Sequence, residues 1–215
     1  MQLLEGIRIR AFLTAVGKVG EMNLLEKLSV DPTLAHDYKP AEEVMKAIND
    51  KIESARDGKD SIGGTVTCII ESVPAGIGNP IYGKLNAKLA EAMMGINAAK
   101  GFEIGLGSEL ARRQGSEVID EFVREEQGTI FTRTNYSGGI QGGISNGMPI
   151  FFNVHFKPTP TIGQPIPLIN EDSQTVIEVI KGRHDPCVAV RAVPVVKAMA
   201  ALVLANHLEN LPLIK

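Results

Sequence analysis

The spacing of hydrophobic residues changes twice in the first third of the chain. Apolar and polar residues alternate over residues 7–13, which predicts a strand with one buried face. Over residues 40–57 the apolar positions take helical spacing, with Pro40 in the first turn and Gly58 as the expected C-terminal cap. Alternation returns over residues 65–73, which predicts a second, half-buried strand.

The middle of the chain predicts a second helix and further strands. Asn79 and Pro80 are suited to be the N-cap and first residue of this helix, and its apolar stripe consists of Leu85, Leu89, Met93 and Ile96. Short strands are expected over residues 101–106 and 150–156.

The last part of the chain predicts a short strand at 176–180 and a helix over residues 192–208 with Pro194 in its first turn. This helix is apolar on nearly all sides, which is typical of a helix buried within a layer. Several connections between strands are too short to contain a crossover helix. We therefore expect an α+β fold with antiparallel sheet packed on helices.

Composition narrows the class of protein. The 215 residues, 44% of them apolar, suffice for one large domain or two small ones. The net charge of −3 argues against a nucleic-acid-binding protein, which normally has a basic surplus. Two cysteines do not make a disulfide framework, and the start of the chain does not resemble a signal peptide. The longest apolar run, 198–205, is shorter than a membrane span. We expect a soluble, cytoplasmic protein.

Residues 133–147 form the most unusual segment, with two Gly-Gly pairs three residues apart. Such a segment exposes backbone N–H groups that can bind a phosphate or a flat ring, or it forms a glycine-rich hairpin turn. It lacks the Gly-Lys-Ser/Thr of a Walker A loop. Residues 76–81 stand between a strand and a helix, as a dinucleotide fingerprint would, but Ile81 replaces its last glycine and a capped turn fits better.

Two short segments offer charged groups for chemistry. Lys157 follows a predicted strand end and suits a phosphate, with the hydroxyls of Thr159 and Thr161 on a proline-stiffened loop. Residues 182–187, Gly-Arg-His-Asp-Pro-Cys, place a cation, an imidazole and a carboxylate together before the last helix. In this segment Arg183 could bind an anion and Asp185 could move a proton, or Asp185 could be a turn or cap residue paired with Arg183. The single pair His184 and Cys187 does not predict a zinc site.

Four segments together resemble chorismate synthase, and the resemblance extends over essentially the whole chain. They are Gly95-Ile-Asn-Ala-Ala-Lys-Gly-Phe-Glu-Ile-Gly105, Asn135-Tyr-Ser-Gly-Gly-Ile-Gln-Gly-Gly-Ile-Ser-Asn-Gly147, Phe156-Lys-Pro-Thr159 and residues 182–194. The resemblance implies a layered sandwich of helices packed between antiparallel sheets. It also implies 1,4-anti-elimination of phosphate from 5-enolpyruvylshikimate 3-phosphate, which gives chorismate and requires reduced FMN.

The resemblance also implies roles for individual residues. Asp185 and His184 would take part in catalysis, with Asp185 assisting proton movement near the flavin. The residues that would bind the cofactor are Asn97, Ala98, Gly142, Lys157, Pro158, Thr159, Pro160, Thr161 and Arg183. No metal is implied, and the family is tetrameric, so we expect a homo-oligomer.

The main departure from the family is a missing region. Family members are longer and carry two histidines, one in a Gly-Glu-Ser-His-Gly motif, and phosphate-binding arginines in an N-terminal part that has no counterpart here. We therefore interpret residues 1–215 as the C-terminal portion of one chorismate synthase-like domain, inactive by itself. Two alternatives are a non-catalytic fragment that folds and assembles and, less favoured, a nucleotide-binding oxidoreductase built on residues 76–81.

Overall fold

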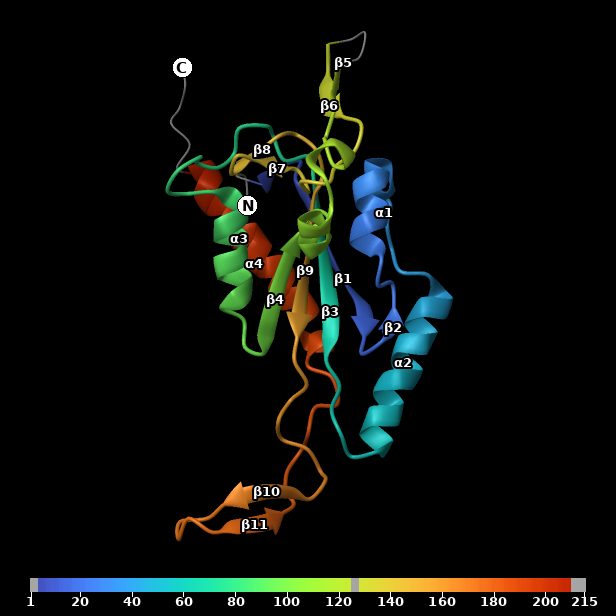
Figure 1. The fold of residues 1–215 in the computed structure, drawn as a ribbon, viewed down its shortest axis with the longest axis vertical. Helices are drawn as coiled ribbons and strands as arrows, with labels where there is room; N and C mark the ends of the chain where they lie inside the picture. The colour runs from blue at the N-terminus through green and yellow to red at the C-terminus, as the bar shows by residue number, and fades with distance from the viewer. Residues whose placement is uncertain (1–3, 125–127, 210–215) are drawn as a thin grey trace.

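A five-stranded antiparallel sheet forms the centre of the protein (Figure 1). The computed structural model describes residues 4–124 and 128–209. The sheet has the order β2-β1-β3-β9-β4 and every neighbouring pair is antiparallel. Its strands are β1 (Arg8–Val16), β2 (Val19–Gly20), β3 (Gly64–Glu71), β4 (Ala99–Ile104) and β9 (Ile150–Phe156). This architecture confirms the predicted α+β class.

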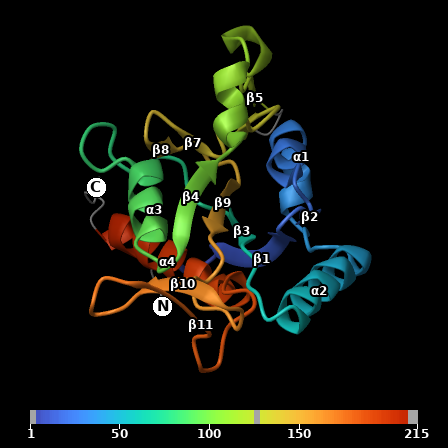
Figure 2. The same cartoon turned by 60° about the horizontal axis from the view of Figure 1, so that its bottom comes forward.

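Helices lie on both sides of the sheet, α3 and α4 on one side and α1 on the other, in both views of the fold (Figures 1 and 2). The helix α4 packs along β1 and β3, and α2 lies beside β2 at the edge of the sheet. The four helices are α1 (Leu24–Val30), α2 (Glu42–Asp57), α3 (Leu85–Met94) and α4 (Ala189–Glu209), and three short 3-10 helices are η2 (Pro32–Ala35), η3 (Gly107–Arg112) and η4 (Gly115–Glu117).

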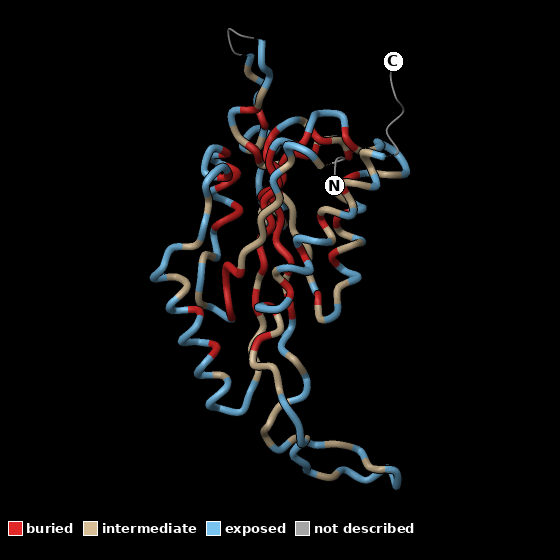
Figure 3. Tube along the Cα trace, turned by 180° about the vertical axis from the view of Figure 1, so that it is seen from behind, coloured by how far each residue is buried: buried red, intermediate tan, exposed pale blue. Residues whose placement is uncertain are grey.

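The buried residues are concentrated on the inner strands of the sheet (Figure 3). On the face toward α3 and α4, Cys68 of β3 and Phe152 of β9 belong to the larger core. On the opposite face, Ile69 and Phe151 pack with leucines of α1 in a smaller cluster. Both inner strands are covered on two sides, and this explains why β9 is apolar at nearly every position.

Three small hairpins extend from this body. They are β5 (Phe122–Arg124) with β6 (Ile130–Thr132), β7 (Ile140–Gln141) with β8 (Ile144–Ser145), and β10 (Ile166–Ile169) with β11 (Thr175–Glu178). The β10–β11 hairpin projects away from the sheet at the end opposite β5 (Figure 1). Every residue of its two strands is half-buried or exposed.

Most predicted elements are confirmed, but the start of the second helix was wrong. The helix α3 begins at Leu85, whose N–H donates to the carbonyl of Gly143 at 2.9 Å. Asn79 instead caps a separate turn, in which its side-chain oxygen accepts from the N–H of Ile81 at 3.1 Å. An Asn-Pro pair starts a turn as readily as a helix, and the sequence pattern does not distinguish the two.

The prediction that the last helix is buried on all sides was also wrong. Only one side of α4 is buried, and Val190, Val195 and Leu202 are exposed. The helix starts three residues earlier than predicted, which places Pro194 inside it. By length and composition alone, α4 is long and apolar enough to cross a membrane. The uninterrupted apolar run 198–205, on which the expectation from sequence rested, is too short for a span. In the structure α4 packs on the sheet.

Two glycines with nearly the same positive φ permit a stability prediction. Gly105 has φ +58° and Gly142 has φ +61°, but a Cβ on Gly105 would lie 2.1 Å from the carbonyl oxygen of Tyr136, whereas a Cβ on Gly142 meets no atom within 4 Å. We expect Gly142→Ala to lower the free energy of unfolding by about 1 kcal/mol, the cost of the backbone conformation alone. Gly105→Ala should cost about 3 kcal/mol or more because a clash is added. Urea denaturation measures both, and equal losses would contradict the structure.

Candidate functional site

Residues from two predicted segments meet at the end of the sheet where β9 finishes and β4 begins. Because these strands are antiparallel, with Ala99 opposite Phe156, the residues that follow β9 lie beside those that precede β4. The N–H of Lys157 donates to the carbonyl of Ala98 at 3.0 Å. Asn97 and Lys157 are both exposed beside this contact. The structure therefore brings together the first two groups of predicted site residues.

The third predicted segment is tied to the same place through residues 61–63. The hydroxyl of Ser61 donates to the carbonyl of Thr159 at 2.6 Å, and the N–H of Ile62 donates to the carbonyl of Pro186 at 2.8 Å. The hydroxyl of Thr159 also donates to the carbonyl of Asp185 at 3.0 Å. Three segments far apart in the sequence thus form one connected site.

Beside the third segment lies a cavity of about 440 Å³ with three arginines on its walls, Arg56, Arg183 and Arg191. The segment places both His184 and Asp185 on the same cavity. Three guanidinium groups around one cavity suit a phosphate or carboxylate, because each can donate two parallel hydrogen bonds.

The partner of Asp185 is Arg191, whose Nε lies 3.0 Å from Oδ2 of the carboxylate. The interpretation that paired it with Arg183 was therefore wrong. Arg191 is the third residue of α4, where the positive end of the helix dipole disfavours a cation. The nearby carboxylate compensates for this unfavourable position. Sequence reasoning missed Arg191, which lies one residue before the predicted helix, and Arg56 gave no signal either.

The environments of His184 and Cys187 limit the reactions that these two side chains can take part in. Nε2 of His184 lies 2.8 Å from the carbonyl oxygen of Ile180, which only accepts, so Nε2 carries the hydrogen. In the neutral ring Nδ1 is then the nitrogen that can accept a proton. Burial raises the pKa of the Cys187 thiol, while the N–H groups of Ala189 and Val190 act in the opposite direction. Cys187 is thus a neutral thiol and a poor nucleophile.

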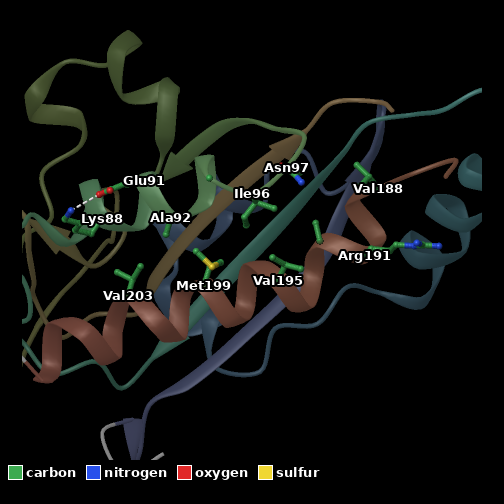
Figure 4. A pocket seen from close by; sticks show the side chains of 12 residues that line it. Lys88, Glu91, Ala92, Ile96, Asn97, Val188, Arg191, Val195, Met199 and Val203 are labelled. Carbon is green, nitrogen blue, oxygen red and sulfur yellow. Dashed lines mark hydrogen bonds and ion pairs between the residues drawn. The ribbon is translucent and has the colours of Figure 1, made fainter. Parts of the chain in front are cut away.

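A second, apolar cavity of about 700 Å³ lies between α3 and α4 and adjoins the arginines (Figure 4). Ile96, Val195 and Met199 line its middle, and Asn97 lies at the end that also holds Val188 and Arg191. Arg191 lines both cavities. The site therefore combines a cationic region with an adjacent apolar groove.

Gly142 is the one predicted site residue that does not lie near the others in this chain. It lies in the β7–β8 turn at the opposite end of β9 from Lys157, and a seven-residue strand spans about 20 Å (Figure 1). Positive φ at Gly142 and Gly143 gives the hairpin turn that was one of the two interpretations. The contact of Gly142 with flavin stays a prediction.

Residues 76–81 also pack on that hairpin. The N–H of Gly76 donates to the carbonyl of Ser145 at 2.8 Å, and a Cβ on Gly78 would lie 2.4 Å from the carbonyl oxygen of Gly143. Close packing of two backbones thus explains Gly78, whereas Gly76, where a Cβ would meet no atom within 4 Å, is explained by its φ of +96°.

Comparisons with known proteins agree with one another. The family model for chorismate synthase matches residues 1–208. A chorismate synthase of Cytophaga hutchinsonii is 45% identical over 206 residues, which are 95% of this chain and 57% of that protein. One of Porphyromonas gingivalis is 47% identical over 207 residues, 94% of this chain and 55% of that protein. A crystal structure of chorismate synthase matches with a TM-score of 0.73 and 31% identity, over 94% of this chain and 57% of the solved chain. The chain thus spans little more than half the length of these relatives.

Proposed function

Because this chain belongs to the chorismate synthase family, we propose that it is the C-terminal portion of an enzyme of the shikimate pathway. The enzyme eliminates phosphate from 5-enolpyruvylshikimate 3-phosphate in the 1,4-anti sense and forms chorismate, with reduced FMN as cofactor. We further propose a cytoplasmic homotetramer, as in the family.

The observation that carries the proposal is the cationic cavity that adjoins an apolar groove. FMN combines a phosphate with a large flat ring. The proposed substrate, 5-enolpyruvylshikimate 3-phosphate, carries a phosphate and carboxylates. Arg56, Arg183 and Arg191 supply cations for such anions. Lys157 adds a fourth cation on the neighbouring loop, which the hydroxyl of Thr159 links to the carbonyl of Asp185. The groove between α3 and α4 offers apolar side chains with the amide of Asn97 at one end. This donor set fits FMN.

Different residues of the site have different proposed roles, which follow from the chemistry of their side chains. Reduced FMN, when bound, supplies electron density to the substrate ring. Lys157, Thr159 and Thr161, on a loop stiffened by Pro158 and Pro160, orient the ligands, with Asn97 and Ala98 beside them.

Asp185 and His184 are the groups that can hold a proton. One carboxylate oxygen of Asp185 is fixed by Arg191, and this contact orients the side chain so that the other oxygen can accept a proton. Nδ1 of His184 is the second acceptor, since Nε2 is engaged with the carbonyl of Ile180.

Two substitutions in a full-length enzyme that carries these residues separate proton transfer from binding. Asp185→Asn keeps the shape of the side chain but removes the base, so turnover should fall by about 10²-fold or more. The affinity for FMN should stay within a few-fold, because the lost ion pair involves the exposed Arg191. Arg183→Ala should instead weaken FMN binding by about 1.5–3 kcal/mol, the usual contribution of a hydrogen bond to a charged group.

Fluorescence titration measures FMN binding, and an anaerobic assay measures turnover for both variants. The assignment of Asp185 as a base is overturned if Asp185→Asn unfolds the enzyme. It is also overturned if the variant loses FMN binding but each site that still binds FMN turns over at the normal rate. Asp185 would then be a structural turn residue.

A further inference from the structure

A separate cavity of about 380 Å³ lies on the other face of the sheet, between α1 and η3. Its walls come from α1, β4, η3 and β9, and it shares no lining residue with the two cavities described above. Its volume is within the range of small-molecule sites. Its walls are largely polar, in contrast to the groove between α3 and α4.

One wall of this cavity includes Asn153, which is only 9% exposed. The hydroxyl of Thr67 donates to the side-chain oxygen of Asn153 at 2.6 Å. Because that hydrogen is committed, Thr67 accepts from the hydroxyl of Thr14 at 2.8 Å. This directional chain turns the carboxamide oxygen of Asn153 toward the threonines and its NH2 group toward the cavity. Within residues 4–124 and 128–209 no acceptor is paired with this NH2 group, so it is available to a ligand.

Charged groups of both signs line the same cavity. The carboxylate of Glu103 accepts from the hydroxyl of Ser108 at 2.5 Å and pairs with Nε2 of His155 at 3.1 Å. Burial tends to raise the pKa of Glu103, but these hydrogen bonds hold it below its usual range, so the group is an anion. Arg113 lies 3.6 Å from Glu26, a loose contact that leaves several N–H donors of the guanidinium free for another acceptor.

From this arrangement we propose that the cavity binds a small free α-amino acid with an aliphatic side chain. Arg113 and the NH2 group of Asn153 donate to its carboxylate, and Glu103 accepts from its ammonium group. Leu25 and Leu106, which also line the cavity, contact the side chain. A simple anion does not fit, because three glutamates face one arginine there. A metal ion is also disfavoured, since these glutamates are not arranged to hold one, and neither is any other group of three His, Cys, Asp or Glu residues in the part of the chain that the structure describes.

Calorimetric titration of the full chain with L-leucine tests this proposal. We expect saturable binding with Kd of about 1 mM or tighter. Isopentylamine lacks the carboxylate and 4-methylpentanoate lacks the ammonium group, so each should bind about tenfold more weakly or not at all. The proposal is overturned if L-leucine shows no saturable binding, or if either analogue binds as well.

Arg112 and Arg113 are adjacent and both exposed, so their substitution should leave the fold intact and they provide matched variants. Arg113→Gln should weaken L-leucine binding by about tenfold or more, whereas Arg112→Gln, which removes only the contact with Glu109, should leave it unchanged. Asn153→Asp keeps the acceptor for Thr67 but replaces the NH2 donor by a negative oxygen, and should also weaken binding. Equal affinities for the two arginine variants would place the ligand elsewhere and refute the site.

Discussion

Purified residues 1–215, supplied with reduced FMN and 5-enolpyruvylshikimate 3-phosphate, are expected to form no measurable chorismate. The family's two N-terminal histidines and its additional phosphate-binding arginines have no counterpart in these residues. Loss of one positioned general acid lowers turnover by about 10²–10⁴-fold, and loss of several groups together with binding residues lowers it further. An anaerobic assay that follows chorismate formation measures the effect.

The full-length chorismate synthase of Cytophaga hutchinsonii serves as the positive control in the same assay. Turnover by residues 1–215 close to that of the control would refute the interpretation of this chain as an inactive C-terminal portion. It would also mean that the arginines and the Asp185–His184 pair suffice for the reaction. Binding of FMN without turnover would agree with the alternative of a non-catalytic fragment that folds.

The second large effect is expected from Arg10→Ala, which should lower the free energy of unfolding by about 3 kcal/mol. Arg10 forms an ion pair with Glu71 at 2.7 Å, and the two side chains are 14% and 6% exposed. The same guanidinium donates to the carbonyls of Ala35, His36 and Tyr38, and so holds residues 35–38 against β1. The variant leaves a buried carboxylate without its main partner and three carbonyls without their donor.

Arg8→Ala is the matched control, because Arg8 reaches the same carboxylate at 3.9 Å but is 58% exposed. Its loss should cost less than about 1 kcal/mol, as for other exposed ion pairs. Urea denaturation followed by circular dichroism compares the two variants. Similar losses for both would show that the buried ion pair does not hold β1 to residues 35–38.

Hydrophobic periodicity predicted the elements whose pattern of burial follows directly from the local sequence. It failed where contacts with residues far away in the sequence determine the bounds or the burial of an element. The strand over residues 150–156 was predicted at its observed bounds, because burial on both faces leaves β9 apolar at five of its seven positions. The start of α3 was not predictable, since it depends on a carbonyl of Gly143 nearly sixty residues away. The exposed side of α4 was missed for a related reason. Hydrophobicity around a helix does not say which side the sheet covers.

The candidate site shows the same division. Arg183, His184 and Asp185 could be identified because they are adjacent in the sequence next to a proline. Arg56 lies on α2, and only the packing of this helix against the edge of the sheet brings it to the same cavity. Local sequence therefore identified the residues of one segment, while the folded chain was needed to find their partner on α2.

Because β9 lies between β3 and β4, these two strands cannot complete their pairing until β9 has been synthesised on the ribosome. Both neighbours are made before β9, and β3 emerges about 80 residues earlier. At translation speeds of about 5–20 residues per second, one edge of β3 waits roughly 4–16 s for its partner. During this interval its unpaired backbone groups and apolar side chains are open to other chains, and among the five strands of the sheet β3 has the longest interval before its second edge is paired.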